Sequence, residues 1–347
     1  MKDLTGFATR GYFAAANGYT GFRSYFDEIF APEKFARIFI LKGGPGTGKS
    51  TLMQKFATHF FEKGVEVDAI LCSSDSDSLD GVILHGAQQV AVLDGTSPHV
   101  RDTLVPGAVD ELVDLGSGWN TAMLTQRREE ILLLQEQKKR QYQSAYESLN
   151  IAGHIYLKAQ KGIRAKFDTS RAREVAKRLA ADAPVKGPRG TRLFEAFSRN
   201  GMERMERFEA TSPVFVRGEY ETGALLLSLL SRELSRRGAA FIRYPSPLLE
   251  SKTDGILLGG QLYLVSEDVG ELNAEELLQP LSTAEHAEYA ALCLLHDRFT
   301  SRAAQAMARA AAQHAALEEI YREAMDFSQN EATLQRLIAA AQEAVNL

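Results

Sequence analysis

The chain of 347 residues has few of the features that mark secreted or membrane proteins. It contains two cysteines, Cys72 and Cys293, which are too few for a disulfide framework and are expected to be reduced thiols. No apolar run approaches the roughly 18 residues that a membrane span needs. The first ten residues lack the apolar segment of a secretory signal. We therefore expect a cytoplasmic protein without a membrane partner.

A strong excess of charge of one sign is also absent. The net charge of -5 argues against a general binder of nucleic acids or membranes. One exception is the segment 158–207, which holds fourteen Lys or Arg and six Asp or Glu. This basic segment could contact phosphates, which leaves nucleic acid as a weakly supported partner. It could equally pair with the acidic remainder of the chain.

What the sequence does contain is a complete phosphate-binding motif. The apolar, β-branched run 38–41 has the pattern of a buried parallel strand. It leads into G-x-x-x-x-G-K-[ST], residues 43–50, and then into an amphipathic helix that stops near Gly64. In such a loop the backbone amides and the helix N-terminus bind phosphates. The predicted nucleotide-binding residues are Gly43, Gly44, Pro45, Gly46, Thr47, Gly48, Lys49, Ser50 and Thr51.

Two of these residues and one later carboxylate have predicted chemical roles. Lys49 would reach the β- and γ-phosphates, and the Ser50 hydroxyl would bind Mg²⁺. Asp94 follows the predicted strand 90–93 and is the candidate for the acidic Mg²⁺ ligand. The alternative for Asp94 is a turn-forming residue after a strand. Gly95 stands where many P-loop motors carry a glutamate, which weakens an assignment to the AAA+ or ABC classes.

A second acidic segment follows the next predicted strand, 65–71. Asp75 and Asp77 lie there in a Ser/Asp-rich stretch. Ligands bind at the carboxyl ends of strands in doubly wound sheets, so both carboxylates are candidate catalytic groups. Either could orient the attacking group or accept a proton from an acceptor hydroxyl. The alternative is a solvated loop or helix cap.

The second half of the chain reads as a copy of the first. Residues 214–223 match the first strand and loop when Gly43 is placed on Gly218, which puts Lys49 on Ala224 and Ser50 on Leu225. A helix and a strand follow in both copies. The repeat therefore predicts a duplicated fold whose second phosphate site is degenerate.

The repeat also serves as an internal control for the other candidates. At an offset of 174, Asp80 falls on Asp254, and we interpret this shared Asp-Gly pair as a turn. The shared glycines Gly86 and Gly260 indicate a turn between strands. The same offset places Asp75 on Leu249 and Asp77 on Ser251, which favours a functional role for both carboxylates, whereas the offset of 175 that the loop follows would place Asp75 on Glu250. The offset of 174 places Asp94 on Asp268, so it gives no support to Asp94.

Long helical segments follow each copy. Residues 125–161, 282–327 and 330–345 favour helices, and Ser282 with Glu285 fits a capping box. We divide the chain into an active P-loop domain with a helical extension (1–166), a basic helical linker (167–192) and a degenerate second domain with its own helical extension (193–347). Arg189 or Arg192 could serve as an arginine finger, although a flexible basic linker is the simpler interpretation.

These patterns predict an α/β, P-loop NTPase fold: a parallel sheet flanked by helices, duplicated, with long helical extensions. The chain resembles a poorly characterised bacterial family of tandem P-loop proteins described as ATP-binding or ATPase-like. The segments 37–51, 72–81, 93–99 and 106–111 carry the resemblance. It implies ATP binding and no particular substrate. Both halves usually carry P-loops in that family, whereas the second loop here lacks its Lys and Ser/Thr.

Three functional hypotheses follow. The first is an ATPase that binds ATP and Mg²⁺ at one working site, with Lys49, Asp75 and Asp77 as catalytic residues and Ser50 and Asp94 as metal ligands. The second is a kinase, in which Asp75 or Asp77 deprotonates a small acceptor. The third is a non-catalytic, nucleotide-gated module whose helical arms bind a partner.

Overall fold

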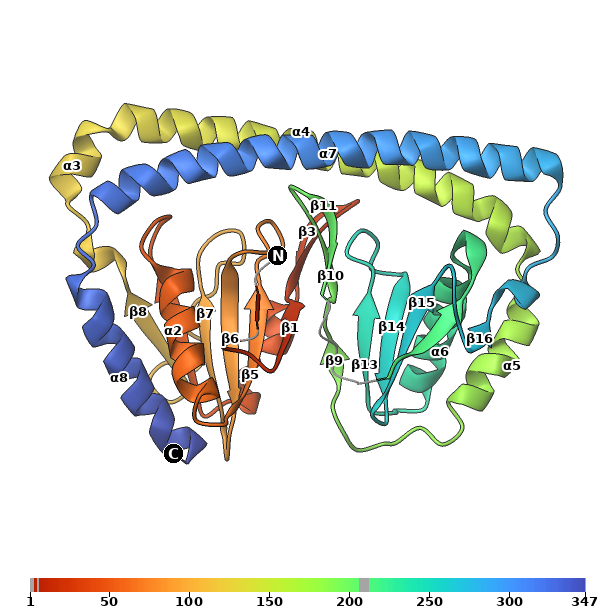
Figure 1. The fold of residues 1–347 in the computed structure, drawn as a ribbon, viewed down its shortest axis with the longest axis horizontal. Coiled ribbons are helices and arrows are strands. Elements are labelled where there is room, and N and C mark those ends of the chain that lie inside the picture. Colours follow the sequence, from red (N-terminus) through yellow and green to blue (C-terminus); the bar gives the residue numbers. More distant parts are fainter. Residues whose placement is uncertain (1–2, 5, 206–211, 347) are drawn as a thin grey trace.

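The computed structural model describes residues 3–4, 6–205 and 212–346, so the end of the basic segment, 206–207, lies outside the described residues. Two α/β halves lie side by side beneath a pair of long helices (Figure 1). In the first half, an antiparallel hairpin follows the first strand; in the second half, a similar hairpin follows the first strand of that half. The hairpins are β2 (Ala15–Gly18) with β3 (Gly21–Ser24), and β10 (Glu195–Ser198) with β11 (Gly201–Arg204).

The first half contains a six-stranded sheet. Its order is β1 (Arg10–Phe13), β5 (Glu66–Leu71), β6 (Leu79–His85), β7 (Gln89–Asp94), β4 (Arg37–Lys42) and β8 (Asp110–Asp114). The predicted strands 38–41, 65–71 and 90–93 are confirmed. Strand β6 runs antiparallel to both of its neighbours, and the other neighbours are parallel. The α/β class is confirmed, but the sheet is mixed and not the parallel sheet that the sequence predicted.

The predicted turn at Asp80 is also wrong. Asp80 lies inside β6, and it is buried. Leu79 pairs with β5, and the apolar residues Val82, Ile83 and Leu84 pair with both neighbouring strands. The whole of 79–84 is buried, including Asp80, and the chain reverses afterwards at Gly86. The predicted turns at Gly86 and Gly260 are confirmed, since each connects two antiparallel strands.

The second half repeats the sheet of the first. Its order is β9 (Gly190–Thr191), β13 (Phe241–Pro245), β14 (Thr253–Leu258), β15 (Gln261–Ser266), β12 (Val214–Arg217) and β16 (Leu272–Asn273). Each strand has the same direction relative to its neighbours as its counterpart in the first sheet. The two similar sheets agree with the repeat found in the sequence.

One helix in each half follows the strand that lies next to the edge of the sheet, β4 or β12, and packs on the sheet. These are α2 (Lys49–Phe61) and α6 (Thr222–Arg236), and each buries one apolar face. Glycines with positive φ, Gly64 (82°) and Gly238 (66°), follow the two helices and let the chain turn into the next strand. A short helix, α1 (Phe26–Ile29), lies against β9 at the junction of the halves.

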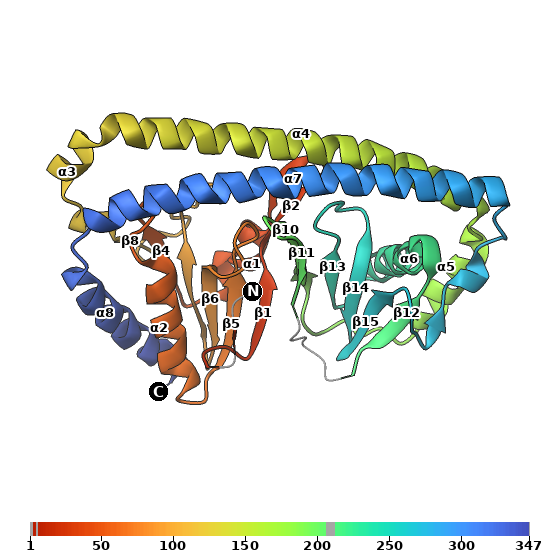
Figure 2. The ribbon, with the colours of Figure 1, turned by 45° about the horizontal axis from the view of Figure 1, so that its top comes forward.

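Two long helices cross the top of both halves. They are α4 (Arg128–Lys166), which follows the short α3 (Thr121–Gln126), and α7 (Thr283–Glu323). The capping box of Ser282 and Glu285 is present at the start of α7, as predicted. Views at two angles show α4 and α7 side by side along their lengths (Figures 1 and 2). In the described part of the chain, no helix combines the length and apolar character that crossing a membrane requires.

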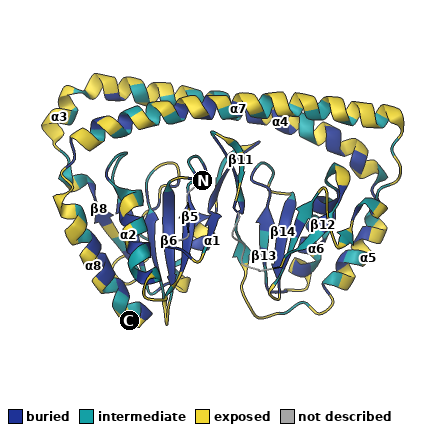
Figure 3. Ribbon diagram, in the orientation of Figure 1, coloured by how far each residue is buried: buried dark blue, intermediate teal, exposed yellow. Residues whose placement is uncertain are grey.

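Each long helix crosses from one half to the other, so the helix that follows it packs on the opposite half. After α4, helix α5 (Thr169–Leu179) packs on α6 of the second half; after α7, helix α8 (Ser328–Val345) packs on α2 of the first half. Leu337, Ile338 and Ala341 of α8 are buried in the first core, and Ala172 and Ala176 of α5 are buried in the second (Figure 3). The first core is therefore completed by α8, which follows the long helix of the second half, α7. The second core is completed by α5, which follows the long helix of the first half, α4.

The packing of α8 on the first half makes a quantitative prediction for stability. Leu337→Ala removes a fully buried side chain from the first core and should lower the free energy of unfolding by about 2–5 kcal/mol. Gln335→Ala, on the exposed face of the same helix, should change it by less than about 0.5 kcal/mol. Urea unfolding followed by the emission of Trp119, the single tryptophan, measures both. Equal stability of the two variants would contradict the packing of α8 on this half.

Candidate functional site

The predicted phosphate-binding loop, 43–50, connects β4 to α2. Gly46 (φ 72°) and Gly48 (φ 84°) have left-handed backbone conformations that side chains rarely adopt. Gly48 is the residue before α2, so the first amides of the helix point into the loop. The Thr47 hydroxyl donates a hydrogen bond to the carbonyl oxygen of Gly44 (3.0 Å) and closes the turn. The glycines of the motif thus occur where the backbone requires them.

Lys49 and Asp94 lie together at this loop. Lys49 Nζ donates to the carbonyl oxygens of Gly43 and Gly44, both at 2.9 Å, and lies 3.6 Å from Asp94 Oδ2. Asp94 Oδ1 accepts hydrogen bonds from the amide (2.9 Å) and hydroxyl (2.6 Å) of Thr96, which orient the carboxylate. The side chains of Lys49 and Asp94 are 11% and 14% exposed, so screening of their charges by water is limited.

The other predicted residues of the loop have structural partners. Ser50 Oγ accepts a hydrogen bond from the amide of Leu79 (3.0 Å), which ties the start of α2 to β6. A hydroxyl oxygen has a second lone pair, so this bond leaves Ser50 able to bind a cation. Thr51 is exposed on the first turn of α2, and Pro45 is half-buried at the tip of the loop.

Asp80 and His99 form a buried pair next to Asp94. Asp80 precedes Gly81, which pairs with Leu93 in the β6–β7 ladder, and His99 Nε2 is 3.3 Å from Asp80 Oδ2. His99 Nδ1 is 3.0 Å from the carbonyl oxygen of Asp94. Burial lowers the pKa of His99, but the nearby carboxylates of Asp80 and Asp94 outweigh it, and the net pKa is raised. Sequence reasoning missed this pair, because Asp80 was interpreted as a turn residue and nothing local marks His99 as its partner.

Asp75 and Asp77 lie in the loop between β5 and β6 and share a partner from the second half. Arg199, in the turn between β10 and β11, places Nη2 3.1 Å from Asp75 Oδ1 and 3.8 Å from Asp77 Oδ2. Asp75 Oδ1 also accepts a hydrogen bond from the amide of Asp77 (3.2 Å). Sequence reasoning did not find Arg199, because nothing local marks it as a neighbour of this loop.

The two arginines that the sequence suggested as fingers have other contacts. Arg189 donates to the carbonyl oxygens of Ala239 (2.9 Å) and Gly238 (2.8 Å) in the second half. The guanidinium of Arg192 lies 4.8 Å from the centre of the Tyr12 ring. The arginine that pairs with the acidic loop is Arg199.

Residues far away in sequence cover loop 43–50. A Cβ on Gly46 would lie 2.6 Å from the carbonyl oxygen of Glu318 in α7, and a Cβ on Gly44 would lie 3.0 Å from the ring of Trp119. Asn330 of α8 donates a hydrogen bond to the carbonyl oxygen of Thr47 (3.0 Å). The end of α7 and the start of α8 therefore rest directly on the loop.

His314 of α7 connects this cover to the charged groups below it. Burial, Lys138 and Lys49 lower the pKa of His314 to about 4, and Asp75 and Asp94 oppose the shift. Lys138 of α4 lies closest, with Nζ 3.4 Å from His314 Nδ1. His314 is therefore neutral at pH 7. Its pKa depends on the charges of Lys49 and Asp94 at loop 43–50 and on the charge of Asp75 in the acidic loop.

The paired strands correct the sequence match of Asp94. In β6 and β7, Gly81 pairs with Leu93; in β14 and β15, the equivalent Gly255 pairs with Leu264. Asp94 therefore corresponds to Val265 and not to Asp268. The constant offset failed because the turn after β14, residues 259–260, is shorter than the turn after β6, residues 86–88. The pairing of β4 with β7 and of β12 with β15 gives the same correspondence.

The second loop contains an anion of its own. Glu221 takes the place of Gly46 and has a left-handed backbone (φ 62°), and Lys252 Nζ lies 2.6 Å from its Oε1. Lys252 Nζ is also 3.5 Å from Asp254, the counterpart of Asp80. Burial lowers the pKa of Lys252, but Asp254 and Glu221 raise it well above its usual value. At the position of the first half's glycine loop, the second half therefore has an internal ion pair between Lys252 and Glu221.

Comparison of the chain with protein-family models, with curated proteins and with solved structures finds no significant match. The functional argument therefore depends on the geometry of this chain and on the contrast between its two halves.

The charge coupling at the site can be measured. Lys138→Gln removes a positive charge beside His314, so the pKa of His314 should rise from about 4 toward its usual 6.5. In the unfolded chain His314 binds a proton at its usual pKa of 6.5, whereas in the folded protein it does so only near pH 4. The free energy of unfolding should therefore fall as the pH drops from about 6.5 to about 4. The fall should be smaller in Lys138→Gln, because the pKa of His314 in the folded variant lies closer to 6.5.

An NMR titration of the His314 ring reports the pKa directly. Lys139→Gln is the matched control, because Lys139 is the exposed neighbour of Lys138 on the same helix. An identical His314 titration in wild-type protein and Lys138→Gln would show that the two side chains are not coupled.

Proposed function

We propose that this protein binds ATP with Mg²⁺ at loop 43–50 and hydrolyses it, with one working site and one degenerate site. The observation that carries the proposal is the contrast between the halves. The second half keeps the strand order, the Thr47 hydroxyl bond (as Thr222 to Glu219, 2.9 Å) and the carboxylate of Asp80. It lacks the groups that match Lys49, Ser50 and Asp94. These three are the residues that phosphate and metal binding require.

The residues of the site suit the proposed ligands. Left-handed glycines and the first amides of α2 provide hydrogen-bond donors for phosphate oxygens, and Lys49 provides a positive charge. Ser50 and Asp94 would hold Mg²⁺, which supplies neutralisation of the charge on the β- and γ-phosphates. Trp119 contacts Gly44, and its buried Nε1 has no hydrogen-bond partner among the described residues.

The surrounding residues would carry out the other tasks of a hydrolase. The end of α7, with Tyr321 packed on Trp119 (ring centres 5.5 Å apart), would exclude bulk water from loop 43–50. Asp75 or Asp77 would orient the attacking water. Arg199 lies beside both carboxylates, 3.1 Å from Asp75 Oδ1 and 3.8 Å from Asp77 Oδ2, which leaves the second oxygen of each carboxylate for a water or an acceptor hydroxyl. The kinase hypothesis therefore stays as the second candidate function.

The remaining expectations stand as part of the proposal. ATP binding agrees with the resemblance to tandem P-loop proteins. Cys72 and Cys293 are both free thiols, which supports a reducing compartment such as the cytoplasm. Nucleic acid keeps only the support of the basic segment.

The single tryptophan provides a native reporter of binding. Titration with ATP and Mg²⁺ should change the emission of Trp119, because its ring contacts the loop at Gly44. Lys49→Ala should weaken this binding by at least about tenfold, since it removes a charged donor to phosphate. Lys55→Ala, one turn or more along α2 and 59% exposed, should bind like the wild type. Normal ATP binding by Lys49→Ala would refute the assignment of the site.

The reaction itself is tested with γ-labelled ATP, with and without a pool of small metabolites. We expect label in inorganic phosphate under both conditions, and a loss of turnover of about a hundredfold in Asp94→Ala. Label on an acceptor would favour the kinase. Tight, Lys49-dependent binding without turnover would favour the non-catalytic module. Unchanged turnover in Asp75→Ala and Asp77→Ala would remove these residues from the mechanism.

A further inference from the structure

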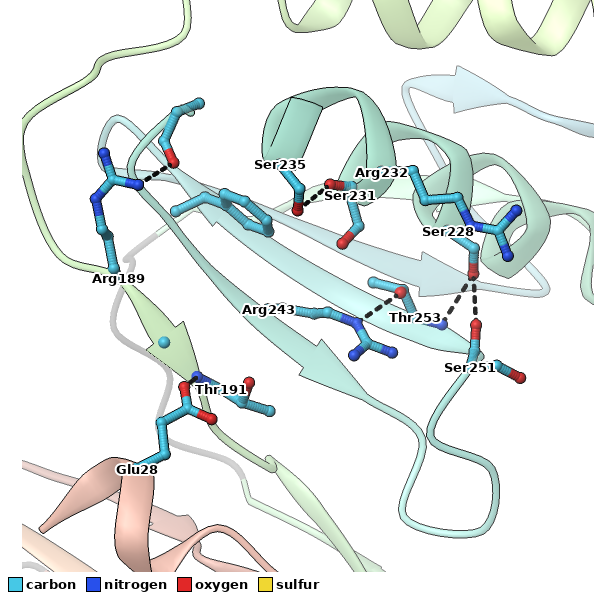
Figure 4. Close-up of a pocket in the computed structure, with 13 residues that line it drawn as sticks. Glu28, Arg189, Thr191, Ser228, Ser231, Arg232, Ser235, Arg243, Ser251 and Thr253 are labelled. Carbon is cyan, nitrogen blue, oxygen red and sulfur yellow. Dashed lines mark hydrogen bonds between the residues drawn. The ribbon is translucent and has the colours of Figure 1, made fainter. Parts of the chain in front are cut away.

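A second polar cavity lies in the other half of the molecule. It has a volume of about 550 Å³ and opens between α6, β13, β9 and the end of α1 (Figure 4). Three arginines line it, Arg189, Arg232 and Arg243, together with six serine or threonine side chains. Among the described residues that line it, Glu28 of α1 is the one acid, and its Oε1 accepts a hydrogen bond from the amide of Thr191 (2.7 Å). The lining is therefore strongly basic in a chain whose net charge is -5.

Two of the arginines, Arg243 and Arg232, have donors to offer, and Arg243 is also held in place. Arg243 Nε donates to Thr253 Oγ1 (3.1 Å), and its Nη2 donates to the carbonyl oxygen of Glu250. A guanidinium has five N–H donors, so Arg243 keeps unused ones. Arg232 is exposed and makes no hydrogen bond or ion pair with the described residues. Figure 4 shows Arg243 between Thr191 and Thr253, and Arg232 on the α6 side of the cavity.

The equivalent groove of the first half is apolar. By strand pairing, Arg243 corresponds to Ala69, because each pairs with the same position of the following strand. Thr253 corresponds to Leu79 at the offset of 174. The buried faces of the helices match at the same offset, which places Ser231 on Ala57 and Ser235 on Phe61. Polar groups have thus replaced apolar ones along one side of the groove.

The first half also closes its groove, whereas the second leaves it open. A Cβ on Gly11 would lie 2.4 Å from Leu4 and 2.6 Å from Met205, so these two side chains fill the space beside β1. Both are buried in the first core. The residue that corresponds to Gly11 is Thr191, and it lines the open cavity. An open groove that carries arginines and hydroxyls provides the charge and the hydrogen-bonding groups that a polar, anionic ligand would need.

We propose that this cavity binds a small phosphorylated sugar or polyol. Arg232 and Arg243 would bind the phosphate, because guanidinium groups pair with phosphate oxygens through charge-assisted hydrogen bonds. The hydroxyls of Ser231, Thr191 and Thr253 suit the hydroxyl groups of the ligand, since each can donate and accept. The volume lies within the range of small-molecule sites, roughly 300–1,000 Å³. The site is separate from loop 43–50, so the inference does not depend on the proposed ATPase function.

Isothermal titration calorimetry tests the proposal on the full chain carrying Lys49→Ala, so that loop 43–50 does not contribute. The probes are ribose 5-phosphate, glucose 6-phosphate and glycerol 3-phosphate, with ribose and inorganic phosphate for comparison. We expect at least one of the phosphorylated probes to bind, and to bind more tightly than inorganic phosphate. Absence of binding by all three probes would overturn the proposal. Binding of inorganic phosphate with equal affinity would overturn the role of the hydroxyl groups.

Three further variants locate the binding. Arg232→Gln should weaken it by about tenfold, and it should fold normally because Arg232 is exposed. Arg236→Gln, on the same helix but outside the cavity, is the matched control and should bind like its parent. Glu28→Gln should tighten binding several-fold, because it removes the negative charge and keeps an oxygen for Thr191. Equal affinities for Arg232→Gln and Arg236→Gln would place any binding elsewhere.

Discussion

The antiparallel packing of α4 on α7 is the interaction on which the rest of the structure depends. Small side chains at the contact, Ala145, Ala303 and Ala306, let the two helices approach closely around Leu149 and Met307. Because α7 runs back over the first half, α8 is delivered to the apolar face of α2 and the end of α7 reaches loop 43–50. Separation of the two long helices would therefore open the first core and uncover the loop together.

The two halves show how one scaffold can keep its architecture while its chemistry changes. Both halves have the same strand order and the same type of hairpin, and both have a bulge at the end of one strand, β5 in the first half and β13 in the second. The differences concentrate in two places. One loop has a lysine and a free helix N-terminus, and the other has Glu221 already paired with Lys252. One groove is filled by Leu4 and Met205, and the other is open and basic. If both proposals hold, each half retains one ligand site, at a different position.

Much of the fold could be predicted from the sequence because it is encoded locally. The apolar run before Gly43, the glycine pattern and the capping box at Ser282 each specify short segments, and the structure has those segments where expected. The antiparallel direction of β6 was missed because an Asp-Gly pair normally marks a turn, and here burial of the whole run prevailed. The counterpart of Asp94 was missed because the turn between β14 and β15 is shorter than the turn between β6 and β7. A constant sequence offset does not reveal this difference. His314 and Asn330 were missed because only the path of the long helices brings them to the site, and Arg199 was missed because it arrives on the β10–β11 hairpin of the second half.

The packing of α8 on the first half has a consequence for biosynthesis. Thr47 and its partner Asn330 are separated by 283 positions in sequence, so the first half emerges from the ribosome long before the helix that covers it. At translation rates of about 5–20 residues per second, the apolar face of α2 is synthesised tens of seconds before α8, the helix that covers it. A nascent chain in that state is a natural client for chaperones that shield apolar surface. Contacts of such long range also slow folding, so the second half, whose helix α5 precedes its strands, is expected to mature first.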